Sequence, residues 1–331
     1  MNGRPPKVGV IGAGPWGRNL IRNAAQMGML AAVCDPNPRA LEAISKEYPG
    51  VAVHSDLAGI LRVDADGMIV AAPAALHAEA ALAAIMHGKH VFVEKPLALN
   101  ERDAGKIVEA AGRRGVQVMV GHLLLYHPAV EKMLDIARAN GIGRLRHLRA
   151  RRWGYGRVRS HENVWWSFAP HDVAVMLALF GDFPQRASQS RATYLQRGIS
   201  DFTYTDFVFQ EDRSAHLEAG WLDVEKQSRI DVFGERGVLS FVDSPQGGSL
   251  TLTPTEQHHA AGGEVILDRG KPLPIPFDLR EPLSIELDAF RRAMLFGETT
   301  RSTGVQGVQV VRALAMAERD ALEPADLEVV A

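Results

Sequence analysis

The chain has 331 residues, a length typical of about two domains, and its 46% hydrophobic and 23% charged residues are ordinary for a soluble globular protein. A formal net charge of −2 argues against a general nucleic-acid binder. The single cysteine, Cys34, excludes an intrachain disulfide, and no stretch reaches the ~18 apolar residues of a membrane span. The N-terminus lacks the pattern of a signal peptide, so we expect a cytoplasmic protein with no membrane partner.

The first third of the chain alternates between strand and helix patterns. Strands are predicted in KVGVIGAG, LAAVCD, DGMIVAAP, HVFVEKP and VQVMVGH, and the segments between them have helical spacing. Asn37 and Asn100 stand where helix N-caps are expected. Repeated strand–helix units of this kind predict a Rossmann domain, a doubly wound parallel sheet, over residues 1–122.

The pattern changes in residues 123–331, which we assign to a second α/β domain. PAVEKMLDIARAN predicts one more helix, and TYTDFVFQ and RSAHLEAGWL predict antiparallel strands. A hairpin is predicted to turn between Gly234 and Gly237, whereas TEQHHAAGGEV predicts an exposed loop. GVQGVQVVRALAMAERDAL predicts an amphipathic helix near the end of the chain.

The segment GVIGAGPWGRN carries the strongest local signal for a cofactor. Gly12, Gly14 and Gly17 fit the G-x-G-x-x-G spacing between a strand and a helix, where a pyrophosphate meets the helix N-terminus. A purely structural glycine turn is the alternative. Asp35 ends the next strand, close to the ~20-residue offset of an acid that binds the adenosine ribose. This acid favours NAD over NADP, although the nearby Arg39 leaves NADP open.

Four motifs together resemble the glucose–fructose oxidoreductase/inositol dehydrogenase/MocA family of sugar dehydrogenases: GVIGAGPWGRN, VAAPAALHAEAA, VFVEKPLAL and WWSFAPHDVAVM. The resemblance implies an α/β domain with a large open, mostly antiparallel sheet after the Rossmann domain. GHLLLYHPAV and GRVRSHENVWWSFAPHD resemble the branch that oxidises the C3 hydroxyl of UDP-N-acetylglucosamine with NAD. A partner aminotransferase then aminates the 3-keto product, in a 3-amino sugar pathway for lipid A or another cell-surface glycan. The resemblance also implies a homodimer or homotetramer.

Two residues are predicted to carry the catalysis. Lys95 follows a buried strand at the edge where ligands bind, and its charge favours a developing alkoxide. His171 stands at the family's acid/base position, and the ordinary pKa of a histidine suits a general base near neutral pH. We therefore expect His171 to be the general base and Lys95 its electrostatic partner. The same reasoning also allows Lys95 to be the base and His171 the partner. Ser167 replaces the family's acid four residues before His171, so a carboxylate relay through residue 167 is not expected.

The remaining site residues are expected contacts, mostly implied by the resemblance. Predicted cofactor contacts are Gly12, Ala13, Gly14, Pro15, Trp16, Gly17, Asp35, Arg39, Ala72, Pro73, His77, Glu94, Lys95 and His122. Predicted substrate contacts are Lys95, Tyr126, Arg157, Arg159, Asn163, Trp165, Trp166, His171 and Asp172. Helix capping is the alternative for His77, and core packing is the alternative for His171 and for each tryptophan. No histidine pair has metal-ligand spacing, so no metal is expected.

The arginine run RLRHLRARRWGYGRVR does not decide between the possible substrates. Arg157 and Arg159 suit a diphosphate, and most of the other arginines are interpreted as a solvated or subunit-contact face. The alternatives to UDP-N-acetylglucosamine are the same chemistry on a UDP-uronic acid or on a free sugar or inositol, and a non-catalytic NAD-binding regulator.

Overall fold

The computed structural model of the protein describes residues 5–156, 158–160, 162–244, 247–260, 262–319 and 321–322. These residues form two compact units. The first contains the chain up to Tyr126 together with Glu281–Arg312, and the second contains His127–Arg280 together with residues from Ala313 onwards. The predicted domain boundary after residue 122 stays a prediction, and the structure adds that a later segment returns to the first unit.

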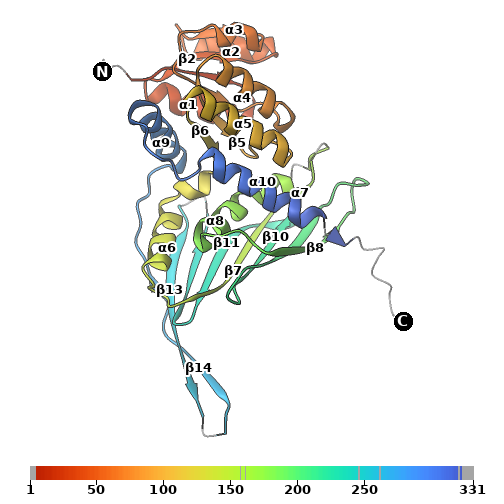
Figure 1. Cartoon of the computed structure of the whole chain (residues 1–331), viewed down its shortest axis with the longest axis vertical. Helices are drawn as coiled ribbons and strands as arrows, with labels where there is room; N and C mark the ends of the chain where they lie inside the picture. Colours follow the sequence, from red (N-terminus) through yellow and green to blue (C-terminus); the bar gives the residue numbers. More distant parts are fainter. Residues whose placement is uncertain are drawn as a thin grey trace. The chain divides into compact units, whose positions relative to one another are not determined.

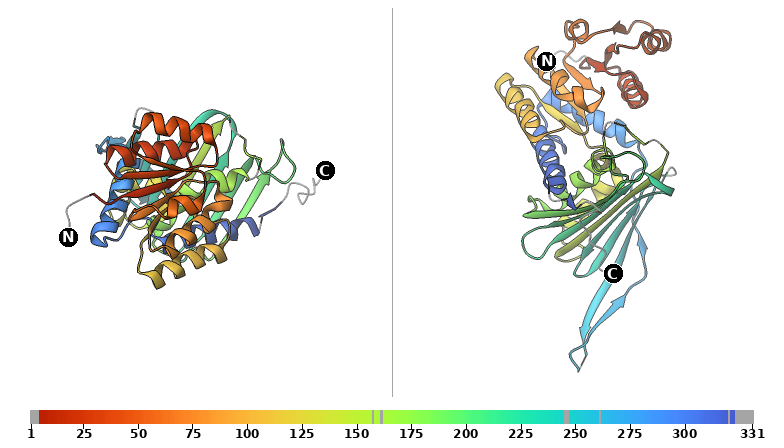
Figure 2. Two further views of the ribbon diagram at one scale, coloured as in Figure 1. Left: turned by 90° about the horizontal axis from the view of Figure 1, so that it is seen from above. Right: turned by 90° about the vertical axis from the view of Figure 1, so that its right-hand side faces the viewer.

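The first unit is built on six parallel strands in the order β3-β2-β1-β4-β5-β6, which is the doubly wound Rossmann order. Helices lie on both faces of this sheet (Figure 2). The strands are β1 (Val8–Ile11), β2 (Leu30–Cys34), β3 (Ala52–His54), β4 (Gly67–Val70), β5 (His90–Glu94) and β6 (Val118–Gly121). The helices are α1 (Pro15–Gln26), α2 (Pro38–Glu47), α3 (Leu57–Leu61), η1 (Ala74–Leu76), α4 (His77–Met86), α5 (Glu101–Arg114), η2 (Leu123–Tyr126), α9 (Pro282–Phe296) and the first part of α10 (Gly304–Arg319).

Local sequence explains these elements. The central strands β1 and β4 are buried at every position, because helices cover both faces of a parallel sheet. Asn37 and Asn100 cap α2 and α5, each accepting a hydrogen bond from a backbone N–H in the first turn. The predicted parallel sheet and both caps are therefore confirmed.

The second unit is built on a mostly antiparallel sheet in the order β14-β13-β12-β11-β7-β10-β9-β8-β16, with β15 beside β13. Within this second sheet, only the β7–β10 and β8–β16 pairs are parallel among the described strands. The strands are β7 (Leu145–Tyr155), β8 (Arg186–Ala192), β9 (Phe202–Val208), β10 (Ser214–Gly220), β11 (Leu222–Gly234), β12 (Gly237–Val242), β13 (Ser249–His259), β14 (Val265–Arg269), β15 (Leu273–Pro274) and β16 (Ala321–Leu322). The helices α6 (Pro128–Arg138), α7 (Val164–Phe168) and α8 (Pro170–Phe180) pack on one face of this sheet (Figure 1).

The turn between Gly234 and Gly237 is confirmed, because these residues pair at the end of the β11–β12 hairpin. The predicted loop over residues 255–265 is wrong. Thr255–His259 of β13 pairs with Val265–Arg269 of β14, and the resulting hairpin extends beyond the neighbouring strands (Figure 1). Every β14 side chain is exposed, so the segment lacks the alternation between buried and polar positions by which strands are predicted.

Candidate active site

The glycine loop between β1 and α1 has the geometry of a pyrophosphate cradle. Gly12 has a φ of +105°, and a Cβ there would lie 2.6 Å from the Ala71 carbonyl oxygen, so a larger residue does not fit. A Cβ at Gly17 would lie 2.1 Å from the Gly12 carbonyl oxygen, so the start of α1 packs directly on the loop. Around Gly14, by contrast, no described residue other than its two chain neighbours comes within 4 Å of the Cβ position. The loop therefore leaves open space at the glycine where a pyrophosphate approaches the backbone.

Asp35 lies directly after β2 and is fixed against the glycine loop. One carboxylate oxygen accepts the Ala13 backbone N–H at 2.7 Å, and the other accepts the Asn37 backbone N–H at 2.8 Å. Each oxygen has a second lone pair, which is available to a ribose hydroxyl. Arg39 is exposed in the first turn of α2. The residues present therefore fit a dinucleotide with a free 2′-hydroxyl.

Glu94 ends β5 with a buried carboxylate that is only 7% exposed. Its Oε1 accepts the Trp16 indole N–H at 2.6 Å, and its Oε2 accepts the Lys95 backbone N–H at 3.2 Å. Gly121 on the neighbouring β6 makes room for it, since a Cβ there would lie 2.9 Å from Oε1. Burial raises the pKa of Glu94 to about 7, although the Trp16 hydrogen bond and the Lys95 charge act in the opposite direction.

His122 and Glu286 are further buried polar groups of the first unit, and Glu286 is not among the predicted residues. Neither side chain has a hydrogen-bond partner in the part of the chain that the structure describes. Burial, and then the Lys95 charge, lower the pKa of His122 to about 3, so its imidazole is neutral. Burial, and then the Glu94 charge, raise the pKa of Glu286 well above its usual range. The two glutamates therefore do not both carry a charge near neutral pH.

A helical pattern in the sequence gives the signal that could have found Glu286. In α9, Leu283, Glu286, Leu287 and Phe290 are all buried and recur at the spacing of one helix face. A carboxylate on such an apolar face is unusual, because burying it costs free energy unless the group is neutral or paired. The chain segment that returns from the second unit thus adds an acid beside Glu94.

His77 lies between the loop after β4 and the segment after β5. Its Nδ1 lies 2.7 Å from the Pro96 carbonyl oxygen, and its Nε2 lies 2.8 Å from the Ala72 carbonyl oxygen. The ring therefore joins the backbone next to Lys95 to the predicted cofactor contacts Ala72 and Pro73. This brings together the first unit's predicted cofactor residues at the carboxyl edge of the parallel sheet.

In the second unit, His171 lies in the first turn of α8, beside Asp172. Both Asp172 oxygens accept hydrogen bonds from Arg152 of β7, each at 2.8 Å, and Asp172 is almost fully buried. Burial opposes the charge on Arg152, but the charge and hydrogen bonds of Asp172 raise its pKa overall. Asp172 thus anchors the start of α8 to the sheet next to His171. Its predicted substrate contact stays a prediction.

The predicted aromatic and amide contacts have partners within their own units. Asn163 caps α7 through the Trp166 backbone N–H, and both the Asn163 amide and the Trp166 indole donate to Glu318. Trp165 is fully buried and donates to the Leu314 carbonyl oxygen, which is the core-packing alternative. The Tyr126 hydroxyl, in the first unit, pairs with Ser302. These contacts hold the fold together, and contact with a substrate stays a prediction for each residue.

Arg159 and Arg157 are the two arginines predicted to bind the diphosphate of the substrate. Arg159 is half exposed and forms an ion pair with Glu162 at 2.9 Å, which orients it without consuming all its donors. Arg157 lies outside the described residues.

Among the residues that the structure describes, no group of three or more His, Cys, Asp and Glu side chains is placed to hold a metal ion. In the same residues, no helix has the length and apolar character needed to cross a bilayer.

A glycine turn from the first strand into the first helix, with an acid at the end of the second strand, defines a dinucleotide-binding Rossmann domain. The comparisons with known proteins agree. Residues 6–122 match the model of an oxidoreductase family with an NAD-binding Rossmann fold, and residues 130–240 match the GFO/IDH/MocA C-terminal domain. The chain therefore belongs to the glucose–fructose oxidoreductase/inositol dehydrogenase/MocA family of oxidoreductases, and its cofactor is a nicotinamide dinucleotide of the NAD type.

Relatives in this family have several activities. The UDP-N-acetylglucosamine 3-dehydrogenase of Acidithiobacillus ferrooxidans is 26% identical, over 93% of this chain and 94% of its own, and its crystal structure superposes with a TM-score of 0.84 over 96% and 97% of the two chains. A protein of known crystal structure from Magnetospirillum magnetotacticum is 30% identical, with a TM-score of 0.82 over 95% of this chain and 100% of its own. A 2,7-anhydro-N-acetylneuraminate hydratase from Mediterraneibacter gnavus is 24% identical over 75% and 70%. The similarities show the family and the fold, and they leave the substrate to be determined.

Proposed function

We propose that the protein oxidises the C3 hydroxyl of UDP-N-acetylglucosamine to a 3-keto sugar nucleotide, with NAD as the hydride acceptor. The observation that carries the proposal is the extent of the similarity to the Acidithiobacillus enzyme, which covers 93% of this chain and so includes both units. Many relatives match a smaller share of the chain, as the hydratase does at 75%. The cofactor part and the proposed substrate part are thus both shared with an enzyme that acts on this sugar nucleotide.

The bound cofactor supplies the hydride acceptor. The side chains of this protein remove the proton of the substrate hydroxyl and stabilise the negative charge on its oxygen. We propose that His171 takes the proton from the C3 hydroxyl as the C3–H hydride departs and the carbonyl forms. The Lys95 ammonium stabilises the negative charge that develops on the C3 oxygen. The Asp172–Arg152 ion pair holds the turn that carries His171. The other proposed substrate contacts are Tyr126, Arg157, Arg159, Asn163, Trp165, Trp166 and Asp172.

The same proposal includes the protein's partners. The 3-keto product carries a carbonyl that an aminotransferase can convert into an amino group, which gives a 3-amino sugar. We therefore propose that an aminotransferase catalyses the next reaction, and that both enzymes act in the cytoplasm. We also propose a homodimer or homotetramer, which light scattering on the eluted protein would measure directly.

Ligand-dependent melting tests the substrate class. With saturating NAD, UDP and UDP-N-acetylglucosamine should each raise the melting temperature, because a ligand that binds only the folded state stabilises it. Free N-acetylglucosamine and inositol should give little or no increase at the same concentration. UDP-N-acetylglucosaminuronate is the competing ligand, and a larger increase with it would replace the proposed substrate by the uronate. No response to any UDP compound would contradict the proposal.

A further inference from the structure

Helix α9 runs along one face of the first unit's parallel sheet and contacts it at successive positions of β5. A Cβ at Gly67 would lie 2.8 Å from Met294 Sδ, and Gly67 pairs with His90 at the start of β5. One helical turn earlier in α9, the ring centre of Phe290 lies 5.9 Å from that of Phe92. The helix therefore proceeds against the direction of the strand, and its residues meet every second residue of β5.

The next position in this series brings Glu286 to Glu94. Glu286, Phe290 and Met294 are four residues apart, so they share one face of α9 and are spaced by ~6 Å along it. Phe92 and Glu94 share one face of β5 and are spaced by ~6.6 Å. Because the two spacings are so similar, the residue one turn before Phe290 faces the residue two positions after Phe92. Glu286 therefore faces the buried carboxyl group of Glu94.

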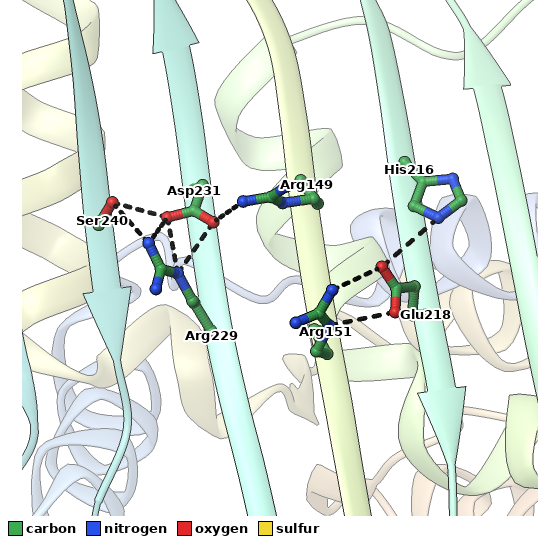
Figure 3. Close-up of polar contacts among 7 residues, drawn as sticks. All are labelled: Arg149, Arg151, His216, Glu218, Arg229, Asp231 and Ser240. Carbon is green, nitrogen blue, oxygen red and sulfur yellow. Dashed lines mark hydrogen bonds and ion pairs between the residues drawn. The ribbon is translucent and has the colours of Figure 1, made fainter.

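A buried carboxylate that is charged has arginine partners elsewhere in this protein. On the second unit's sheet, Asp231 is only 2% exposed and accepts hydrogen bonds from Arg149 at 2.8 Å and Arg229 at 2.9 Å (Figure 3). Burial opposes the charge on Asp231, but these hydrogen bonds lower its pKa overall. Among the described residues, no donor reaches either oxygen of the fully buried Glu286. The surroundings of Glu286 therefore favour a neutral carboxylic acid.

The other titratable and charged groups around the two glutamates do not change their charge near neutral pH. They are Lys95, His122, Tyr126, Arg301 and the exposed Arg22–Glu281 ion pair at the start of α9. The buried His122 is neutral, and burial raises the pKa of Tyr126 to about 12, so its hydroxyl keeps its proton. Near neutral pH, the carboxyl pair is therefore the part of this cluster that gains or loses a proton.

The pair belongs to the half of the Rossmann domain that receives the nicotinamide. Asp35 follows β2, in the half that binds the adenosine, whereas Glu94 ends β5 in the other mononucleotide-binding half. The nicotinamide ring of oxidised NAD carries a positive charge, and that of NADH carries none. A positive charge near Glu94 favours its ionised form. On the predicted cofactor contact of Glu94, the two oxidation states of the cofactor therefore favour different protonation states of this residue.

We propose that Glu286 is a positioning residue of the dinucleotide site that acts through Glu94: it stays a neutral acid, and its dipole stabilises the Glu94 carboxylate that forms as oxidised NAD binds. The Glu94 proton passes to solvent when oxidised NAD binds and stays in place when NADH binds. The pair thus couples the pH to the oxidation state of the bound cofactor. This coupling is independent of the sugar that the protein oxidises.

Titration calorimetry without substrate, in two buffers of different ionisation enthalpy, counts the protons released. Because the pKa of Glu94 is raised to about 7, oxidised NAD should release roughly half a proton at pH 7 and close to one at pH 6. Below its pKa the residue must lose a proton before it is charged, so the affinity for oxidised NAD should fall about fivefold from pH 7 to pH 6. NADH should release less than half as many protons.

Substitutions separate the roles of the two glutamates. E94Q should abolish the proton release, and the control E298Q should keep it, because Glu298 lies after α9 and pairs with Arg292. E286Q retains a neutral polar group and should keep the wild-type pH midpoint. E286L removes the dipole beside Glu94, so the midpoint should move upward by about one pH unit. A merely structural role of Glu286 would lower the melting temperature of E286L without moving this midpoint.

Infrared difference spectra give an independent readout, because a protonated carboxyl group and a carboxylate absorb at different frequencies. Oxidised NAD should remove a protonated-carboxyl band in the wild type and in E286Q, but not in E94Q. A second such band should persist in the NAD-bound wild type and be missing from E286Q, and this band decides the case if E286L does not fold. The proposal is overturned if oxidised NAD fails to bind or releases no proton at pH 6, if folded E286L keeps the wild-type midpoint, or if the second band is missing from the wild type.

Discussion

Replacing Glu94 by glutamine should remove a pH dependence from the stability of the cofactor-free protein. The buried carboxylate has its pKa raised from 4.5 to about 7, which corresponds to roughly 3 kcal/mol between the two protonation states. An acid whose pKa is raised in the folded state contributes stability that is present in full below its unfolded pKa. That contribution is lost as the pH rises toward the folded pKa. The wild type should therefore lose roughly 3 kcal/mol from this group between about pH 4.5 and pH 7.

Urea unfolding at several pH values, followed by far-ultraviolet circular dichroism, measures the effect as the difference between wild type and E94Q. Titrating groups that Glu94 does not influence cancel in this difference, including His122, whose lowered pKa gives a slope of the opposite sign. Glu286 does not cancel fully, because the Glu94 charge contributes to its raised pKa. The W16F variant should move the transition to higher pH, because the Trp16 hydrogen bond lowers the Glu94 pKa. Wild-type and E94Q stabilities that stay parallel within about 0.5 kcal/mol over this range would refute the reasoning.

Three further predictions concern the cofactor and the chemistry. NAD should bind more tightly than NADP, because Asp35 repels a 2′-phosphate, and equal affinities in titration calorimetry would count against this role. Gly14→Val should weaken NAD binding before it lowers the melting temperature, because the Cβ position is open and the new side chain enters the pyrophosphate's approach path. Lys95→Ala and His171→Ala should each reduce turnover about 10²-fold or more and change NAD affinity less. The exposed control His258→Ala should leave turnover unchanged. Wild-type turnover in His171→Ala would exclude His171 as the base.

The sequence predicted the first unit well because its signals are local. The apolar strands, the caps Asn37 and Asn100 and the glycine turn each depend on a few neighbouring residues, and the parallel sheet follows from their order. The β13–β14 hairpin was missed because its side chains are exposed and its strands are defined by backbone pairing alone.

In the candidate site too, residues in local motifs could be predicted from the sequence, whereas residues brought in by tertiary packing could not. Glu94 and Lys95 were found from a local motif, whereas Glu286 approaches Glu94 only because a segment far along the chain returns to the first unit. Strand alternation in the sequence predicts that Arg152 lies on the opposite face from Arg149 and Arg151, but its pairing with Asp172 of α8 is visible only in the structure. Pairings between distant segments depend on tertiary packing, which a local pattern does not specify.

Turnover of UDP-N-acetylglucosamine tests the central proposal most directly. Oxidation of a secondary alcohol by NAD is unfavourable at neutral pH, so the assay follows NADH absorbance while an aminotransferase and an amino donor remove the keto product. The nucleotide sugar should give sustained NADH formation, and free N-acetylglucosamine should be a very poor substrate in kcat as well as KM, because binding of the UDP group aligns C3 for reaction. The proposal would be contradicted if free N-acetylglucosamine or inositol were oxidised as readily as the nucleotide sugar.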